Sequence, residues 1–191
     1  MKALHLFDIE EVDHIISPEN FSHTTLESPA SKIFTDFKRA KALVIDADTT
    51  AAMALEMMMQ EHVRMKIVVS ELGDVLGVIS ANELTERRLV SEIAKGVTRN
   101  DVLVSDLMVP CRDLRAFDYQ ELRQSKVSDV IQALKDNGLR HCLVIDREHH
   151  HIRGVISSSD IARKLRLPLE ISSEASFKHI FEVVRGYKQA C

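Results

Sequence analysis

The tetrapeptide Gly-Val-Ile-Ser occurs twice in this chain, at residues 77–80 and again at 154–157. An acid follows three residues after the serine in each case, Glu83 in the first copy and Asp160 in the second. An apolar run that ends in a hydroxyl residue and is followed by an acid is typical of a strand that leads into a helix. The repeat therefore predicts two copies of one structural unit.

The residues around each tetrapeptide predict the same order of elements: strand, helix, strand, strand, helix. In the first copy these are a strand at 42–45, a helix at 51–60, strands at 67–69 and 75–79, and a helix from 81 to 95, capped by Ser80 and ended by Gly96. In the second copy they are a strand at 114–117, a helix at 127–137 ended by Gly138, strands at 143–145 and 154–156, and a helix from the cap Ser157 to Leu165. Each pair of adjacent strands should form a hairpin.

Three segments lie outside this pattern. Residues 31–37 suit a short helix with Ser31 as its N-cap, because their apolar side chains would share one face. Residues 118–126 resemble an insertion, since the corresponding turn of the first copy is shorter. Residues 176–186 predict a last amphipathic helix.

A unit of about 60 residues is too small to bury its apolar faces well alone. The two units should therefore stack sheet to sheet about a pseudo-twofold axis, as an α/β (α+β) fold of two βαββα repeats. The expected division is an N-terminal arm at 1–29, the first repeat at 30–100, the second at 101–168, and a C-terminal helical extension at 169–191.

Composition excludes several classes of protein. The net charge of −4 provides no broad basic surface for nucleic acid, so direct nucleic-acid binding is not expected. The three cysteines are far apart and odd in number, which disfavours a disulfide framework or a zinc site. The sequence shows no signal peptide and no apolar run of about 18 residues, so we expect a cytoplasmic protein without a membrane span. No catalytic motif is present, which argues against an enzyme.

The repeated pattern resembles the CBS domain family. The second copy carries the resemblance in Val127–Val130, Gly138–Asp146 and Gly154–Asp160. The first copy carries it in Thr50–Leu55, Val63–Val69 and Gly77–Glu83. The resemblance spans about residues 30–166 and implies a tandem pair, often called a Bateman module, which commonly forms a homodimer.

Ser157 and Asp160 are the strongest candidates for ligand binding. A hydroxyl and unpaired backbone N–H groups at a helix N-terminus favour a phosphate, and a carboxylate one turn later can accept hydrogen bonds from ribose hydroxyls. The resemblance implies the same role, since family members that bind AMP, ATP or related adenosyl ligands use these two positions. We therefore expect AMP, ADP or ATP as the ligand, and no required cofactor. Adenine would then lie near Arg140, His141 and Cys142, and near Ser125 and Lys126. The alternative is that Ser157 only caps the helix and that Asp160 only interacts favourably with its positive end.

The first copy offers a weaker second site, formed by Ser80, Glu83, Arg64 and Lys66. Glu83 stands where the second copy has an aspartate, and its longer side chain would displace a ribose contact. We therefore expect this site to be empty. Arg163, on the helix after Asp160, either neutralises a polyphosphate or lies on a solvated face.

The triplet His149–His151 also suggests a metal site. Because adjacent side chains diverge in a hairpin turn, we expect a solvated loop and no bound metal. The first functional hypothesis is a regulatory module that senses an adenine nucleotide and signals to an unidentified partner protein. The alternative is a ligand-free dimerisation or interaction scaffold, and a weaker third reading is a metal-binding stress protein.

Overall fold

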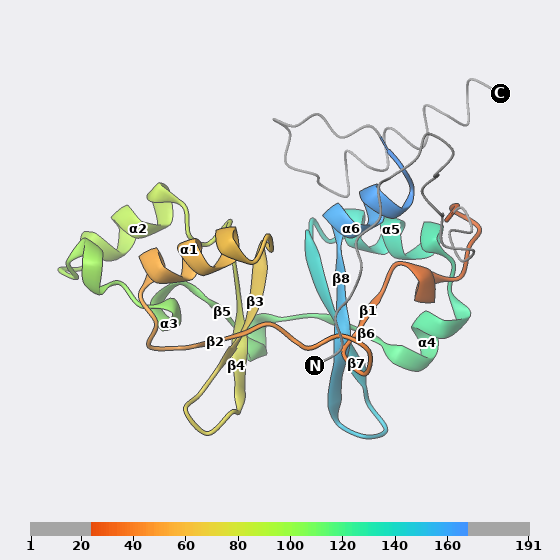
Figure 1. The fold of residues 1–191 in the computed structure, drawn as a ribbon, viewed down its shortest axis with the longest axis horizontal. Coiled ribbons are helices and arrows are strands. Elements are labelled where there is room, and N and C mark those ends of the chain that lie inside the picture. The colour runs from red at the N-terminus through yellow and green to blue at the C-terminus, as the bar shows by residue number, and fades with distance from the viewer. Residues whose placement is uncertain (1–23, 168–191) are drawn as a thin grey trace, which may run out of the picture.

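The computed structural model describes residues 24–167, which form two lobes, each a four-stranded sheet with helices on its outer face (Figure 1). The two sheets face each other across the middle of the molecule. The predicted helix at 176–186, most of the N-terminal arm and the whole C-terminal extension lie outside the described residues. None of the helices within 24–167 is long and apolar enough to cross a membrane.

The first lobe contains the sheet β2-β3-β4-β5. Its elements are β2 (Val44–Asp46), α1 (Ala51–Gln60), β3 (Met65–Val69), β4 (Val75–Ser80), α2 (Glu86–Ile93), α3 (Val104–Leu107) and β5 (Val109–Pro110). Strand β2 is parallel to β3, and β3 and β4 form the predicted antiparallel hairpin. The Thr50 hydroxyl accepts a hydrogen bond from the backbone N–H of Met53 and so caps α1.

The second lobe contains the sheet β1-β8-β7-β6. Its elements are β1 (Thr35–Asp36), β6 (Ala116–Asp118), α4 (Tyr119–Gln124), α5 (Val127–Asp136), β7 (His141–Asp146), β8 (His151–Ser157) and α6 (Ser158–Lys164). Strand β6 is parallel to β7, and β7 and β8 form the second predicted hairpin. The strand-helix-strand-strand-helix order is therefore confirmed in both copies.

Each sheet is completed by a two-residue strand outside that pattern. Strand β1 lies in the segment expected for the first repeat but pairs with β8 of the second. Strand β5 lies in the segment expected for the second repeat but pairs with β4 of the first. The backbones of these short strands come closest to β4 and β8 at the glycines of the repeated tetrapeptide. A Cβ on Gly77 would overlap the carbonyl oxygen of Val109, and one on Gly154 would overlap that of Thr35.

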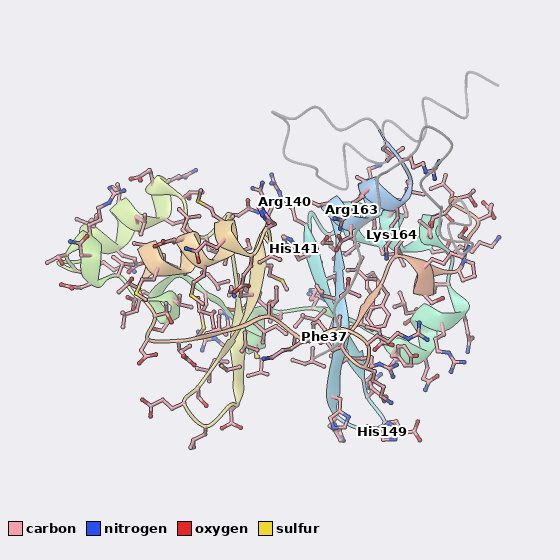
Figure 2. The ribbon with its side chains drawn as sticks, viewed as in Figure 1. Phe37, Arg140, His141, His149, Arg163 and Lys164 are labelled. Carbon is pink, nitrogen blue, oxygen red and sulfur yellow. The ribbon has the colours of Figure 1, made fainter. Side chains whose placement is uncertain are left out.

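Each lobe has its own aliphatic core beneath its helices, and a third cluster joins the facing sheets. Ile67 and Val78 of the first sheet and Leu143 of the second are buried at the centre of this third cluster. Phe37, which follows β1, packs against it and lies between the two lobes in Figure 2. The observed stacking of two small units buries their inner apolar faces, as their size led us to expect.

Two predicted helix positions were wrong. Residues 31–37 form a short 3-10 turn, Ala30–Lys32, followed by β1, because pairing with β8 holds this segment extended. The helix predicted from residue 81 begins instead at Glu86 with Thr85 as its N-cap. The Glu83 carboxylate accepts hydrogen bonds from the backbone N–H and the hydroxyl of Ser80, which closes residues 80–83 into a turn.

Most of the segment 118–126, which the sequence led us to treat as an insertion, forms α4. Asp118 caps this helix by accepting hydrogen bonds from the backbone N–H groups of Gln120 and Glu121. An N-cap followed by a short helical run was therefore present in the sequence.

Candidate functional site

The start of α6 has the geometry of an N-cap with a carboxylate one turn later. The Ser157 hydroxyl oxygen accepts a hydrogen bond from the backbone N–H of Asp160 at 3.0 Å. The same hydroxyl donates to the Asp160 carboxylate at 2.8 Å, and the guanidinium of Arg163 pairs with the other carboxylate oxygen. Both the capping role and an acid beside a helix N-terminus are therefore present.

Ser157 and Asp160 line a cavity of about 570 Å³, called here the Asp160 cavity. Its walls come from three parts of the chain. Strand β8 and helix α6 form one wall, residues 62–65 at the start of β3 form the second, and the segment from Thr35 to Leu43 forms the third. Its volume is within the range of about 300–1,000 Å³ that is usual for small-molecule sites.

The charges in the Asp160 cavity favour an anionic ligand. Lys41, Arg64 and Arg163 are the cationic side chains among the described residues that line it, and Asp160 is the only acid among them. Arg64 belongs to the first copy, Lys41 to the segment after β1, and Arg163 to the second copy. Three separate elements thus bring positive charge to one hollow, beside one carboxylate.

A second, smaller cavity of about 340 Å³ contains Ser80 and Glu83 and is called here the Glu83 cavity. Its opposite wall is formed by residues 137–141, at the start of β7. Arg140 donates to the side-chain oxygen of Asn82 at 3.5 Å across this cavity. The Glu83 carboxylate accepts two hydrogen bonds from Ser80, so it points toward the turn at residues 80–83.

Each of the two cavities is lined by residues from both copies. Each combines the helix start of one copy with the strand start of the other, so that Arg64 lies with Asp160 and Arg140 lies with Glu83. His141 lines both cavities, and Figure 2 shows it between the two sheets, near Arg140. Sequence reasoning had placed Arg140 and His141 with Asp160, within a single copy.

Four predicted site residues lie outside both cavities. Cys142 is 5% exposed in the core of its lobe, and burial raises the pKa of its thiol to about 11. The Lys66 side chain is buried and pairs with Glu61 at 2.6 Å. The Ser125 hydroxyl donates to the carbonyl oxygen of Glu121, and Lys126 pairs with Glu27.

The lining residues that sequence reasoning missed include Thr35, Phe37 and Lys41, together with His62 on the opposite wall. The first three reach the Asp160 cavity because β1 pairs with β8. A two-residue strand leaves no periodic pattern, so the sequence held no usable signal for this wall.

His141 titrates far below its ordinary range. Its pKa is lowered to about 4, with burial as the largest cause; Arg64 and Arg140 also lower it, while Glu83 and Asp160 oppose the shift. Its imidazole is therefore neutral at pH 7, where it can donate one hydrogen bond and accept another.

This shift predicts a loss of stability in mild acid. The unfolded state binds a proton at His141 below about pH 6.5 and the folded state only below about pH 4, so the free energy of unfolding falls as the pH is lowered through this window. Between pH 7 and pH 5 the loss should be about 1–2 kcal/mol. Urea unfolding of the parent protein and of His141→Gln at the two pH values measures it. His151→Gln is the control, because His151 is exposed and its substitution should leave the loss of stability in place. If His141→Gln lost as much unfolding free energy between pH 7 and pH 5 as the parent protein does, the loss could not be assigned to His141.

The sequence matches the family model of the CBS domain at residues 35–89 and 123–167, slightly more than half of the chain. No curated protein matches it. An uncharacterized conserved protein from Pyrococcus horikoshii has a similar structure, with a TM-score of 0.57 and 21% identity, over 78% of this chain and 100% of that one.

Two further similar structures were determined with bound ligands. CBSX2 from Arabidopsis thaliana, in complex with AMP, has a TM-score of 0.52 and 19% identity over 71% of this chain and 94% of its own. The CBS domain pair of MJ0100, in complex with 5′-methylthioadenosine and S-adenosyl-L-methionine, has a TM-score of 0.50 and 14% identity over 71% of this chain and 94% of its own. At these identities the likeness concerns the fold.

Proposed function

Because this chain belongs to the CBS domain family and carries two copies of the domain, we propose that it is a regulatory module that binds an adenine nucleotide in the Asp160 cavity and signals to a partner protein. The observation that carries the proposal is the composition of that cavity. It combines a capped helix start, one carboxylate and three cations from separate elements.

Each part of an adenine nucleotide has a suitable counterpart in the Asp160 cavity. The ribose hydroxyls can donate to the Asp160 carboxylate, in place of the hydrogen bond that Ser157 now makes. The phosphates are complementary in charge to Lys41, Arg64 and Arg163. The apolar side chains of Phe37, Met65 and Val155 offer contact area for adenine.

The fact that both copies line the Asp160 cavity supports a regulatory role. A ligand in the Asp160 cavity would touch both copies at once, so its affinity would depend on how the two sheets sit relative to each other. A ligand shifts such an equilibrium only by its difference in affinity for the two arrangements. Ligand binding would thereby change the surface presented to a partner.

The proposal predicts a ligand-dependent rise in melting temperature that requires Asp160. A ligand at about 100 times its dissociation constant should stabilise the folded state by about 2.7 kcal/mol. We expect at least one of AMP, ADP and ATP to do so, and Asp160→Ala to abolish the shift. Differential scanning fluorimetry measures it, with each variant compared with its own ligand-free melting temperature because the Asp160 carboxylate also accepts a hydrogen bond from the Ser157 cap of α6.

Glu83→Ala is the matched control for Asp160→Ala, since it removes the corresponding acid from the Glu83 cavity and should leave the shift in place. Arg64→Ala should weaken binding although it lies in the other copy. If no adenosyl ligand moves the melting temperature, the proposal fails. A shift that survives Asp160→Ala would place the ligand elsewhere.

One observation favours the ligand-free scaffold as a second candidate. The Asp160 carboxylate is satisfied within α6 by Ser157 and Arg163, so no ligand is needed to complete its hydrogen bonds. In either role we infer pairing with a second copy. Met53 and Met59 of α1 and Val90 of α2 support this, because each is more than half exposed and apolar.

A further inference from the structure

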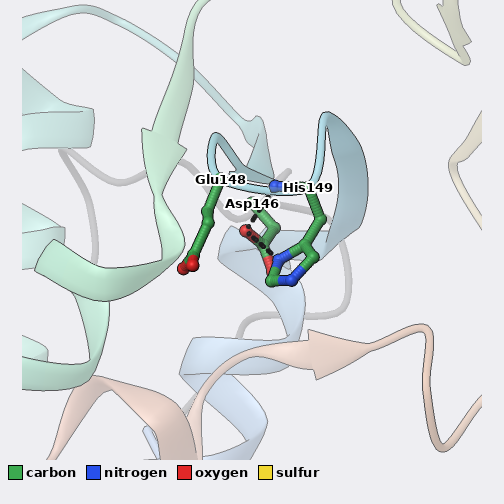
Figure 3. Close-up of side chains that lie close together, drawn as sticks. All are labelled: Asp146, Glu148 and His149. Carbon is green, nitrogen blue, oxygen red and sulfur yellow. Dashed lines mark hydrogen bonds and ion pairs between the residues drawn. The ribbon is translucent and has the colours of Figure 1, made fainter.

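We propose that Asp146, Glu148 and His149 form a binding site for one divalent transition-metal ion of the zinc class, at the tip of the β7–β8 hairpin. The three residues each place one ligand atom within 4.8 Å of the others (Figure 3). This site is separate from the Asp160 cavity and does not depend on the proposed nucleotide.

The geometry of Asp146 and His149 suits a shared metal ion. The Nδ1 atom of His149 lies 3.1 Å from each oxygen of the Asp146 carboxylate. Two ligands of a tetrahedral zinc ion, at bond lengths of about 2.0–2.1 Å, are separated by about 3.3–3.4 Å. A cation can therefore replace the hydrogen that these groups now share after a shift of a few tenths of an ångström.

The hairpin holds Asp146 in place before any metal binds. The side chain of Asp146 is mostly buried, and its carboxylate accepts a hydrogen bond from the backbone N–H of His149 at 3.3 Å. The His151 ring stacks against that of His149, with centroids 6.3 Å apart and planes 9° from parallel. Glu148 is exposed, so its side chain can rotate toward the ion.

A hollow beside the cluster supplies room and charge for the ion. This hollow, of about 750 Å³, has Asp118, Asp146 and Glu148 as its acids and Arg147 as the only Lys or Arg among the described residues that line it. His150 and His151 also line it, whereas His149 reaches the cluster from outside this lining. Three carboxylates against one such cation favour a positively charged ligand. Its open side can hold the water that completes a three-ligand site.

The donor types select the class of metal. Mg²⁺ and Ca²⁺ prefer sites made only of oxygen, whereas an imidazole with two carboxylates suits zinc and its neighbours in the first transition row. The signal Asp-x-Glu-His was present in the sequence, but the expectation of a solvated loop rested on finding no acid at a spacing that supports a site. Only the hairpin shows that Asp146 lies against His149.

Isothermal titration of the full chain, without an affinity tag, with ZnCl₂ and separately with MgCl₂ tests the site. We expect zinc binding that His149→Ala and Glu148→Gln each weaken at least about tenfold, and no comparable binding of magnesium. Both residues are exposed, so neither variant should impair folding. His150→Asn is the matched control, because His150 has a φ of 53° that asparagine tolerates and is not among the three ligands.

Three results would overturn the site: no zinc binding, zinc binding that His149→Ala leaves unchanged, or an equal loss in His150→Asn. The second would assign the ion to other histidines, and the third would indicate a non-specific histidine tract. Magnesium binding as tight as zinc binding would also contradict the role given to the imidazole.

Discussion

Gly154→Ala should destabilise the protein by about 3 kcal/mol or more, because the new methyl group would occupy the space of the Thr35 carbonyl oxygen and of the Phe34 ring. The oxygen belongs to backbone that pairs with β8, so it cannot move without separating β1 from the sheet. Urea unfolding followed by circular dichroism measures the change in the free energy of unfolding.

Two other glycines test this explanation. Gly77→Ala should be comparably costly, since its methyl group would overlap the carbonyl oxygen of Val109 in β5. Gly138→Ala meets nothing within 4 Å and is strained only by its φ of 63°, so it should cost about 1 kcal/mol. If Gly154→Ala lowered the free energy of unfolding by no more than Gly138→Ala does, the explanation by a close approach of β1 to β8 would be wrong.

Arg153→Ala should destabilise the protein by about 2–4 kcal/mol. The Arg153 guanidinium makes two hydrogen bonds of 2.7 Å with the Asp36 carboxylate and lies 4.2 Å from the centre of the Tyr119 ring. The side chains of Arg153 and Asp36 are 12% and 17% exposed, so solvent screens the pair only weakly. This ion pair fixes β1, and with it the wall of the Asp160 cavity that contains Phe37.

A double-mutant cycle with Asp36→Asn isolates the pair from the contact with Tyr119. Arg153→Lys is the conservative variant and should recover only part of the loss, because lysine cannot bind both carboxylate oxygens in the same way. Lys126→Ala, which breaks an exposed ion pair with Glu27, should change little. A negligible coupling between residues 36 and 153 would contradict the role of the pair.

The same pair predicts a second acid transition. Hydrogen bonding from Arg153 is the main cause that lowers the pKa of Asp36 from 3.8 to about 2. Between these values the unfolded state binds more protons than the folded state, so this contribution is complete above about pH 4 and is lost as the pH falls toward 2. It is distinct from the loss at His141, which begins at higher pH.

Most of the fold could be predicted because its signals are local. Apolar runs, polar turns and caps identified α1, α5, α6 and both hairpins, and the confirmed cap at Ser157 is an interaction over three residues. The failure at residues 81–85 was also local in origin. Glu83 and Asp160 occupy matching positions in the two copies. The longer glutamate side chain, however, accepts hydrogen bonds from both the backbone N–H and the hydroxyl of Ser80, and α2 begins only after this turn.

The candidate site could be predicted only in part. The pairing of Ser157 with Asp160 could be read directly from their spacing. The identity of their neighbours could not, because β1 and β5 have two residues each and carry no periodicity that would assign them to a sheet. The pairing of β1 with β8 brings Lys41 to the Asp160 cavity, and the facing of the two sheets brings Arg64 there and takes Arg140 to Glu83.

The amino-acid order thus specified two repeated units, their caps and the acid at each helix start, since these depend on residues a few positions apart. Which residues share a cavity depended on contacts between distant segments, such as Asp36 with Arg153 and Thr35 with Val155. Such contacts form only when the apolar inner faces of both sheets are buried together, and that burial acts on the whole chain rather than on any one stretch of it.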